Sequence, residues 1–165
     1  MRNPLNKKLA KIQLVIFDID GIFTDGSVYV DAAGNELLRF SRIDGQGIQL
    51  IREAGLKTAV ISSADAQASR KRMEKLKIDS IIIGVGTQDK LSHYQALRNQ
   101  YGLRDEQIAY CGDDIMDIAV LQAAGLALCP ANAQEPVKKI CDFVSARTGA
   151  QNFVREICNL LLASR

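Results

Sequence analysis

The sequence predicts an α/β fold built around a mostly parallel sheet, and two observations support this prediction. Short apolar runs rich in β-branched residues alternate with stretches of helical periodicity along all 165 residues. Strands separated by helices are joined by parallel crossovers, which place helices on both faces of the sheet. The length is that of about one domain, so we expect residues 1–165 to form a single domain.

The expected strands are runs of apolar side chains. Residues 13–17 (QLVIF) suit a strand that is buried on both faces. Residues 27–30 and 36–40 flank a segment that contains a Gly-Asn pair, which predicts a β-hairpin inserted at about residues 22–41. The later expected strands are residues 57–61, 80–83, 108–111, 126–128 and 143–144.

Helical periodicity and terminal glycines define the segments between the strands. Gly55, Gly102 and Gly125 stand directly after three of these segments, where helices commonly end. The expected helices are residues 47–54, 66–76, 89–101, 115–124, 136–140 and 152–163. Residues 1–11 carry basic side chains and no acidic one, and we expect a solvated lead into the first strand.

The composition excludes several classes of function. The 21 basic and 19 acidic residues leave a net charge of +2, too balanced for broad attraction to nucleic acid. The four cysteines have no Cys-x-x-Cys spacing and His93 is the sole histidine, so neither a zinc site nor a disulfide framework is expected. No apolar run has the length of a signal core or a membrane span. We therefore expect a reduced, cytoplasmic protein without nucleic-acid or membrane partners, whose chemistry depends on carboxylates.

Acidic and hydroxyl side chains directly follow three of the expected strands. Ligands of parallel sheets bind beyond the carboxyl ends of the strands. The residues expected at this edge are Asp18, Asp20, Ser62, Ser63, Asp113, Asp114 and Asp117. Neighbouring carboxylates repel one another unless a cation lies among them, and a ligand set made of oxygen atoms favours Mg²⁺. Mg²⁺ in turn suggests a phosphate substrate, for which Lys90 at a helix start offers positive charge.

These motifs resemble those of the haloacid dehalogenase superfamily. Residues 17–26 (FDIDGIFTDG) are similar to its first motif, and Ser62, Lys90 and residues 112–117 (GDDIMD) match the second, third and fourth. Within the superfamily, the hairpin and the turn expected at residues 44–47 resemble the capless 3-deoxy-D-manno-octulosonate 8-phosphate phosphatase family. The resemblance spans the chain and implies a three-layer Rossmann-like fold with a hairpin insert and no cap domain.

The resemblance also implies a Mg²⁺-dependent phosphomonoesterase that forms an aspartyl phosphate. Asp18 is then the nucleophile, and Asp20 the general acid and base. Mg²⁺ is held by Asp18, Asp113 and the main-chain carbonyl of Asp20. The expected phosphate-binding residues are Ser62, Ser63 and Lys90. Lys90 is also an expected catalytic residue. The expected supporting residues are Asp25, Asp44, Asp114 and Asp117, where turn capping for Asp25 and helix capping for Asp44 are alternatives.

Two positions depart from the pattern of this family. The family commonly carries one arginine after the second-motif hydroxyl and another near the C-terminus, but this chain has Ala64 and Gln151 there. Because arginine is the preferred partner of a substrate carboxylate, these losses leave the identity of the sugar acid open. The arginines that could substitute are Arg42, Arg147 and Arg155.

The implied substrate is a small phosphorylated sugar acid. The family likeness favours 3-deoxy-D-manno-octulosonate 8-phosphate, and hence lipopolysaccharide precursor synthesis. The alternatives are a phosphatase for another sugar phosphate, such as a nonulosonate 9-phosphate, and a non-catalytic tetrameric assembly module. A signalling receiver domain is disfavoured, since it has adjacent acids after its first strand whereas Asp18 and Asp20 are one residue apart.

A homotetramer is also implied by the resemblance. In this family four subunits pack their hairpins together, so that neighbouring subunits cover the capless active sites. The apolar residues of the expected hairpin, which suit burial by association, are Val28, Val30, Leu37, Leu38 and Phe40.

Overall fold

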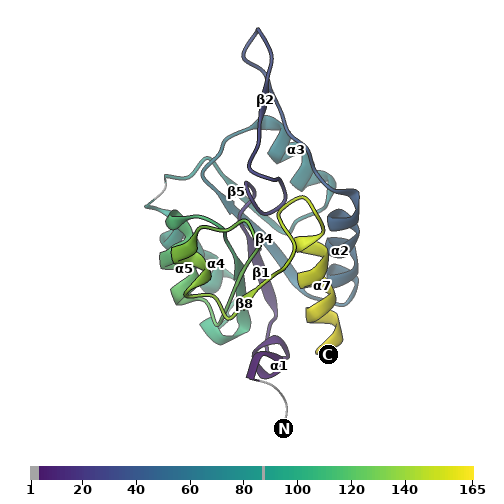
Figure 1. Cartoon of the computed structure of the whole chain (residues 1–165). Helices are drawn as coiled ribbons and strands as arrows, with labels where there is room; N and C mark the ends of the chain where they lie inside the picture. Colours follow the sequence, from purple (N-terminus) through teal and green to yellow (C-terminus); the bar gives the residue numbers. More distant parts are fainter. Residues whose placement is uncertain (1–3, 87) are drawn as a thin grey trace.

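A parallel sheet of six strands forms the centre of the computed structural model, which describes residues 4–86 and 88–165 (Figure 1). The strand order is β5-β4-β1-β6-β7-β8, and every neighbouring pair is parallel. The strands are β1 (Leu14–Phe17), β4 (Lys57–Ser62), β5 (Ser80–Ile83), β6 (Ile108–Cys111), β7 (Leu126–Cys129) and β8 (Phe143–Val144). The predicted α/β class is therefore confirmed.

Helices cover both faces of this sheet. One face carries α2 (Arg42–Glu53), α3 (Gln67–Lys75) and α7 (Phe153–Ala163), and the other carries α4 (Lys90–Gln100), α5 (Ile118–Ala123) and α6 (Glu135–Lys138). In β1 the side chains alternate between the layers, because Val15 and Phe17 join the first apolar cluster while Leu14 and Ile16 join the second. This central strand is fully buried, as its uninterrupted apolar run predicted.

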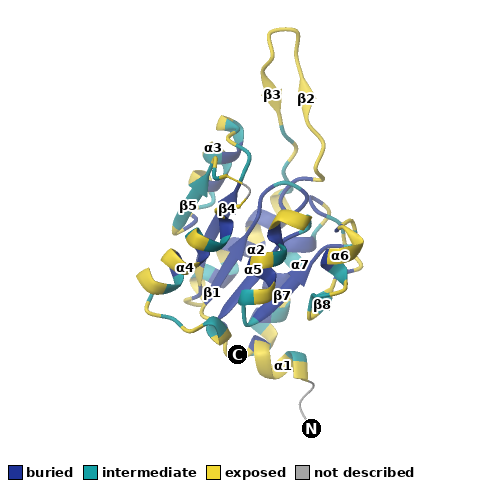
Figure 2. Cartoon of the chain, turned by 90° about the vertical axis from the view of Figure 1, so that its left-hand side faces the viewer, coloured by how far each residue is buried: buried dark blue, intermediate teal, exposed yellow. Residues whose placement is uncertain are grey.

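The hairpin of β2 (Tyr29–Val30) and β3 (Glu36–Leu37) projects from the body of the protein (Figure 2). Its two strands are shorter than the expected segments 27–30 and 36–40, and all four of their residues are exposed. The hairpin extends far beyond the carboxyl ends of the sheet strands (Figure 1). This arrangement agrees with the expected hairpin insert and absence of a cap domain.

Helix α2 corrects the prediction of a turn at residues 44–47. It begins at Arg42, because the Ser41 hydroxyl oxygen accepts hydrogen bonds from the N–H groups of Ile43 (3.1 Å) and Asp44 (3.2 Å). The glycine at position 47 serves packing, since an added Cβ would meet the Cα of Arg155 at 3.1 Å. Tight packing on α7 therefore outweighs the low helix propensity of glycine.

Asp44 joins α2 to the start of α7. Its side chain is buried, and its Oδ1 accepts a hydrogen bond of 2.9 Å from the N–H of Arg155. Asn152, the residue before α7, has a left-handed backbone (φ 73°) and gives no side-chain cap. Burial raises the pKa of Asp44, although these hydrogen bonds oppose the shift. The side chain that caps α2 is Ser41, whereas Asp44 accepts a hydrogen bond from the first turn of α7 and so caps that helix from a distance.

Other element boundaries differ from the predictions. Residues 4–9 form α1 (Pro4–Leu9), whose Leu9 is buried, so this part of the expected solvated lead packs against the core. The helix expected at residues 115–124 begins as a 3₁₀ turn (Ile115–Asp117) before α5. A second 3₁₀ turn, Asp105–Gln107, was not predicted. No helix in the described part of the chain has the length and apolar character needed to cross a membrane.

Removing the Asp44 carboxylate is expected to destabilise the fold. In Asp44→Ala the N–H of Arg155 loses its acceptor and a buried cavity forms, so the free energy of unfolding should fall by about 1–3 kcal/mol in urea titrations. Gln46→Ala, an exposed change in the same helix, should stay within about 0.5 kcal/mol of wild type. Equal stability of the two variants would contradict the capping role.

Candidate active site

A cavity of about 320 Å³ lies at the carboxyl ends of β1, β4 and β6. Its lining contains seven of the predicted site residues: Asp18, Asp20, Ser62, Ser63, Lys90, Asp113 and Asp114. Asp117 is fully buried and contacts this group, whereas Asp25 and Asp44 lie outside the lining. The structure therefore brings together, from four separate segments, the residues that the strand-end argument selected.

Asp18 is held where β1 ends. Its N–H donates to the carbonyl oxygen of Cys111 (2.9 Å), which extends the sheet ladder by one residue. The side-chain Oδ1 accepts a hydrogen bond of 2.7 Å from the N–H of Ile19, and Oδ2 lies 3.1 Å from Nζ of Lys90. Asp18 is buried apart from 6% of its surface, so the carboxylate has a fixed orientation and an ion-pair partner.

Asp117 fixes the position of Lys90. Nζ of Lys90 donates to Oδ1 of Asp117 at 2.8 Å, and the hydroxyl of Tyr110 donates to the same oxygen at 2.7 Å. The other oxygen of Asp117 accepts hydrogen bonds from the N–H groups of Asp113 (3.1 Å) and Asp114 (3.2 Å). One buried carboxylate thus orients the lysine and shapes the turn after β6.

The carboxylate of Asp113 lies against Gly21. Gly21 has a left-handed backbone (φ 71°), and a Cβ at this position would overlap the Asp113 carboxylate. Ligand oxygens of Asp18, Asp113 and Asp117 lie within 4.8 Å of one another, which is close enough to share a metal ion. Asp117 is fully buried outside the cavity lining, and each of its oxygens already accepts two hydrogen bonds, so the cavity-lining carboxylates Asp18 and Asp113 are the ones that fit a metal.

The electrostatics of the cavity favour a divalent cation. Burial and the charges of Asp18 and Asp117 raise the pKa of Asp113 to about 8. Burial and the charge of Asp117 raise the pKa of Asp18 to about 7, although Lys90 opposes the shift. Burial lowers the pKa of Lys90, but Asp18 and Asp117 outweigh it and the net shift is upward. One lysine therefore leaves uncompensated negative charge, which a hard divalent ion can neutralise.

Comparison with known proteins identifies the family. The family model of haloacid dehalogenase-like hydrolases matches residues 48–154. The 3-deoxy-D-manno-octulosonate 8-phosphate phosphatase of Haemophilus influenzae is 34% identical over 164 residues, which are 98% of this chain and 88% of that protein. The chain belongs to the haloacid dehalogenase-like hydrolases. It is an enzyme of the phosphoric monoester hydrolase class, as its motifs predicted.

Solved structures agree with this assignment. A haloacid dehalogenase superfamily hydrolase of Legionella pneumophila is 39% identical, with a TM-score of 0.93, over 97% of this chain and 87% of that one. The 3-deoxy-D-manno-octulosonate 8-phosphate phosphatase of Moraxella catarrhalis, solved with magnesium, phosphate and KDO, has a TM-score of 0.95 and 30% identity. That match covers 100% of this chain and 94% of the other. The predicted superfamily and subgroup are confirmed.

The remaining acidic residues of the family motifs have different surroundings. Burial raises the pKa of Asp20, whose Oδ1 accepts a hydrogen bond of 3.4 Å from the hydroxyl of Thr24. Asp114 accepts a hydrogen bond from the N–H of Ile115 and begins the 3₁₀ turn. Asp25 accepts from the N–H of Ser27 and pairs with Arg39 at 3.4 Å, so it closes the base of the hairpin. For Asp25, the structure therefore shows the turn-capping alternative.

Four residues that the sequence did not single out complete this region. Thr24 binds Asp20 and accepts from the N–H of Gly26 (3.2 Å), and Tyr110 holds Asp117. Asn132 ties two loops together, donating to the Gly21 carbonyl oxygen (3.3 Å) and accepting from the N–H of Gly149 (2.9 Å). Met116 lines the cavity. The phenol of Tyr110 in an otherwise apolar strand was a usable sequence signal, because a buried hydroxyl needs a partner.

None of the described residues that line the cavity is an arginine. Lys90 is its single cationic side chain, and both Asp18 and Asp117 pair with it. The three arginines considered as substitutes, Arg42, Arg147 and Arg155, lie outside the lining. Within a single chain, therefore, none of the described lining residues is an arginine that could bind a substrate carboxylate.

Replacing Asp113 is expected to stabilise the metal-free protein. Its pKa rises from 3.8 to about 8 on folding, so it destabilises the fold increasingly from about pH 4 to pH 8. Asp113→Asn removes this effect, and the melting temperature at pH 8 without divalent ions should rise by about 2–6 °C. The difference should disappear below about pH 3, where the carboxyl is protonated in both the folded and the unfolded state.

The surface variant Asp25→Asn serves as the control. It removes one exposed ion pair, and its melting temperature should stay within about 1 °C of wild type. Added Mg²⁺ should stabilise the wild type and leave Asp113→Asn unchanged. A melting temperature of Asp113→Asn below that of wild type at pH 8 would refute the repulsion argument.

Proposed function

We propose that the protein hydrolyses 3-deoxy-D-manno-octulosonate 8-phosphate with Mg²⁺ through an aspartyl phosphate on Asp18. The observation that carries this proposal is the buried Asp18–Lys90–Asp117 array beside Asp20 and Asp113. The relative from Haemophilus influenzae and the Moraxella catarrhalis complex support the choice of substrate. The four cysteines are free thiols, which supports the expected cytoplasmic location.

The donor set fits Mg²⁺. Asp18 and Asp113 would supply carboxylate oxygens, and the main-chain carbonyl of Asp20 would supply the third ligand that the family resemblance implies, in keeping with the oxygen preference of this ion. When bound, Mg²⁺ screens the repulsion between the Asp18 carboxylate and a phosphate dianion and polarises the phosphoryl oxygens. Gly21 leaves room for Asp113 at this position, because any side chain there would displace the carboxylate.

In the first step, a carboxylate oxygen of Asp18 attacks phosphorus while the bond from phosphorus to the sugar oxygen breaks. Asp20 donates its proton to the departing oxygen, a role that is favoured by burial, which raises its pKa. Lys90, held 3.1 Å from Asp18 by its bond to Asp117, stabilises the charge on the phosphoryl oxygens. Ser62 and Ser63 line the same cavity, where their hydroxyls would donate hydrogen bonds to the phosphoryl group.

In the second step, Asp20 acts as a base. Its carboxylate takes a proton from a water molecule whose oxygen attacks phosphorus, and the bond to Asp18 breaks. Inorganic phosphate and the free sugar acid are the products, and both aspartates return to their starting state. The use of one residue as acid and then as base is what microscopic reversibility requires.

Phosphate release from 3-deoxy-D-manno-octulosonate 8-phosphate tests this function. With Mg²⁺ the wild type should turn over the substrate, and chelation of the metal should abolish activity. Asp18→Asn should lower kcat by about 10³-fold or more, because an amide cannot form the acyl phosphate. Asp25→Asn, outside the cavity, should stay within about twofold of wild type. Full turnover by Asp18→Asn would refute the covalent mechanism.

A second candidate function keeps the chemistry and changes the sugar. The absence of arginine from the described lining favours it, since the carboxylate of a sugar acid has no cationic partner within this cavity. Candidates include a nonulosonate 9-phosphate. A panel of sugar phosphates compared by kcat/KM decides between them, and hydrolysis of none of them would favour the non-catalytic assembly module instead.

We also propose that the hairpin assembles a homotetramer. Large apolar side chains stand exposed on it: Val28 (46%), Tyr29 (67%), Val30 (62%) and Leu37 (64%). A two-stranded ribbon is marginal in water, and exposed apolar surface of this kind commonly marks an interface between subunits. Leu38 and Phe40, which the sequence analysis also counted among the apolar residues of the hairpin, are less exposed because they are partly buried within the subunit. Phe40 packs against the core of its own subunit.

Val30→Lys tests the assembly. Because Val30 is exposed in the single chain, the substitution should leave the melting temperature of the subunit nearly unchanged while its charge disrupts hairpin packing. Light scattering should give a tetramer mass for wild type and a smaller mass for the variant. Val144→Lys, at another exposed apolar position, should keep the tetramer. A monomeric wild type at micromolar concentration would contradict the proposal.

A further inference from the structure

We propose that a cavity between α2 and α3 binds a small phosphate-bearing anion. The two helices lie next to each other on one face of the sheet (Figure 1). The cavity has a volume of about 390 Å³, and its lining residues are Gly45, Gln49, Arg52, Glu53, Lys75, Leu76 and Lys77. It shares no lining residue with the catalytic cavity, so this inference stands apart from the proposed function.

The residues around this cavity carry more positive than negative charge. Arg52, Lys75 and Lys77 line it, and Arg72 adjoins it at Gly45. None of these four cations pairs with a carboxylate among the residues that the structure describes, although nine other basic residues do. The one acid in the lining, Glu53, accepts a hydrogen bond of 2.7 Å from Gln49.

Helix ends account for part of this charge, but not for all of it. Arg52, Arg72 and Lys75 lie in the last turns of α2 and α3, where cations interact favourably with helix carbonyl groups. Lys77 lies beyond the last residue of α3, so a helix end does not account for its charge. The Nε atoms of Arg52 and Arg72 are sealed from solvent, so a ligand in the cavity would contact the other polar atoms of Arg52, Lys75 and Lys77, which line it.

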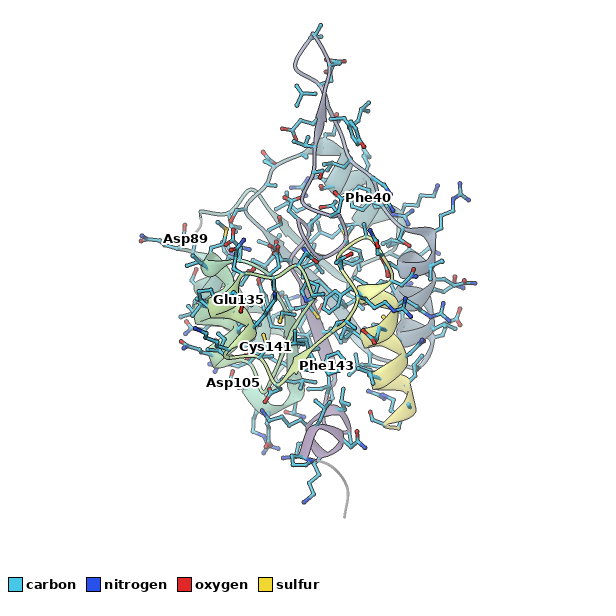
Figure 3. The ribbon with its side chains drawn as sticks, viewed as in Figure 1. Phe40, Asp89, Asp105, Glu135, Cys141 and Phe143 are labelled. Atoms are coloured by element: carbon cyan, nitrogen blue, oxygen red, sulfur yellow. The ribbon has the colours of Figure 1, made fainter. Side chains whose placement is uncertain are left out.

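Arg72 is held in position next to the cavity. A Cβ on Gly45 would come within 2.9 Å of its Nη2, so glycine is what lets the guanidinium lie against α2. Nη2 also donates to the carbonyl oxygen of Ser41 at 3.0 Å, and the guanidinium carbon lies 5.9 Å from the ring centre of Phe40. Phe40 is labelled in Figure 3, below the hairpin. A fixed cation binds an anion with less loss of side-chain freedom than a mobile one.

The size and charge of the cavity indicate the class of ligand. Its volume is in the range of small-molecule sites, about 300–1,000 Å³. Three cations and one carboxylate in the lining leave two net positive charges, which match a phosphate dianion. Guanidinium groups present planar pairs of donors that suit phosphate oxygens. Inorganic phosphate and a phosphorylated small molecule share this chemistry.

Amide NMR of the metal-free full chain, titrated with sodium phosphate at constant ionic strength, tests the proposal. We expect saturable shifts at residues 49–53 and 75–77, with no such response to sodium chloride. A parallel titration with ribose 5-phosphate separates the two sources: tighter binding shows that the sugar also occupies the cavity, and equal binding shows recognition of phosphate alone. Shifts confined to the residues around the catalytic cavity would overturn the proposal.

Two variants and a matched control locate the site. Arg52→Gln should weaken phosphate binding about tenfold, because charge-assisted hydrogen bonds are lost. Lys77→Asn changes an exposed residue and should also weaken phosphate binding. Asparagine is chosen because it tolerates the left-handed backbone of position 77 (φ 56°). Lys71→Gln removes the same charge from α3, but this lysine pairs with Glu74 at 3.3 Å and should leave binding unchanged. Equal weakening by all three variants would show general attraction and refute a defined site.

Discussion

The repulsion among carboxylates at one edge of the sheet is the constraint on which the rest of the structure depends. Asp18, Asp113 and Asp117 bring oxygens within 4.8 Å of one another, and a single buried lysine compensates only part of their charge. Such crowding is stable only when each group has a fixed partner or a cation is added. The Lys90–Asp117 pair supplies the fixed partner, and a divalent ion supplies the remaining charge.

Packing around the catalytic cavity follows from this constraint. Glycine is required at position 21 because the Asp113 carboxylate fills the space of a Cβ, and at position 112 because a Cβ would meet the side chain of Asp117. Gly149 lies against the carbonyl oxygens of Gly21 and Thr24, where Asn132 links the two loops. Close approach to carboxylates at Gly21 and Gly112, and to main-chain carbonyl groups at Gly149, explains these glycines.

The hairpin and the cavity between α2 and α3 meet at the start of α2. Ser41 caps α2 and receives a hydrogen bond from Arg72 of α3, and Phe40 lies under the same guanidinium. The base of the exposed hairpin is therefore anchored by a cation that makes no ion pair with a described carboxylate. The proposed assembly through the hairpin and the proposed anion binding beside α3 would therefore both involve the start of α2.

The sequence by itself determined the strand and helix order and the set of residues at the sheet edge, because these depend on local periodicity and on positions directly after strands. Asp18 and Asp113 were found in this way. Only the tertiary structure decided that Asp117 holds Lys90 across 27 positions and that Asp44 caps α7 across 111. The start of α2 was missed because Gly45 packs against the Arg72 and Leu76 side chains and Gly47 packs against α7, contacts that local propensity does not contain. A side chain can have several possible partners, and the fold determines which of them it contacts. Local sequence spacing carries no information about partners that lie far apart in the sequence.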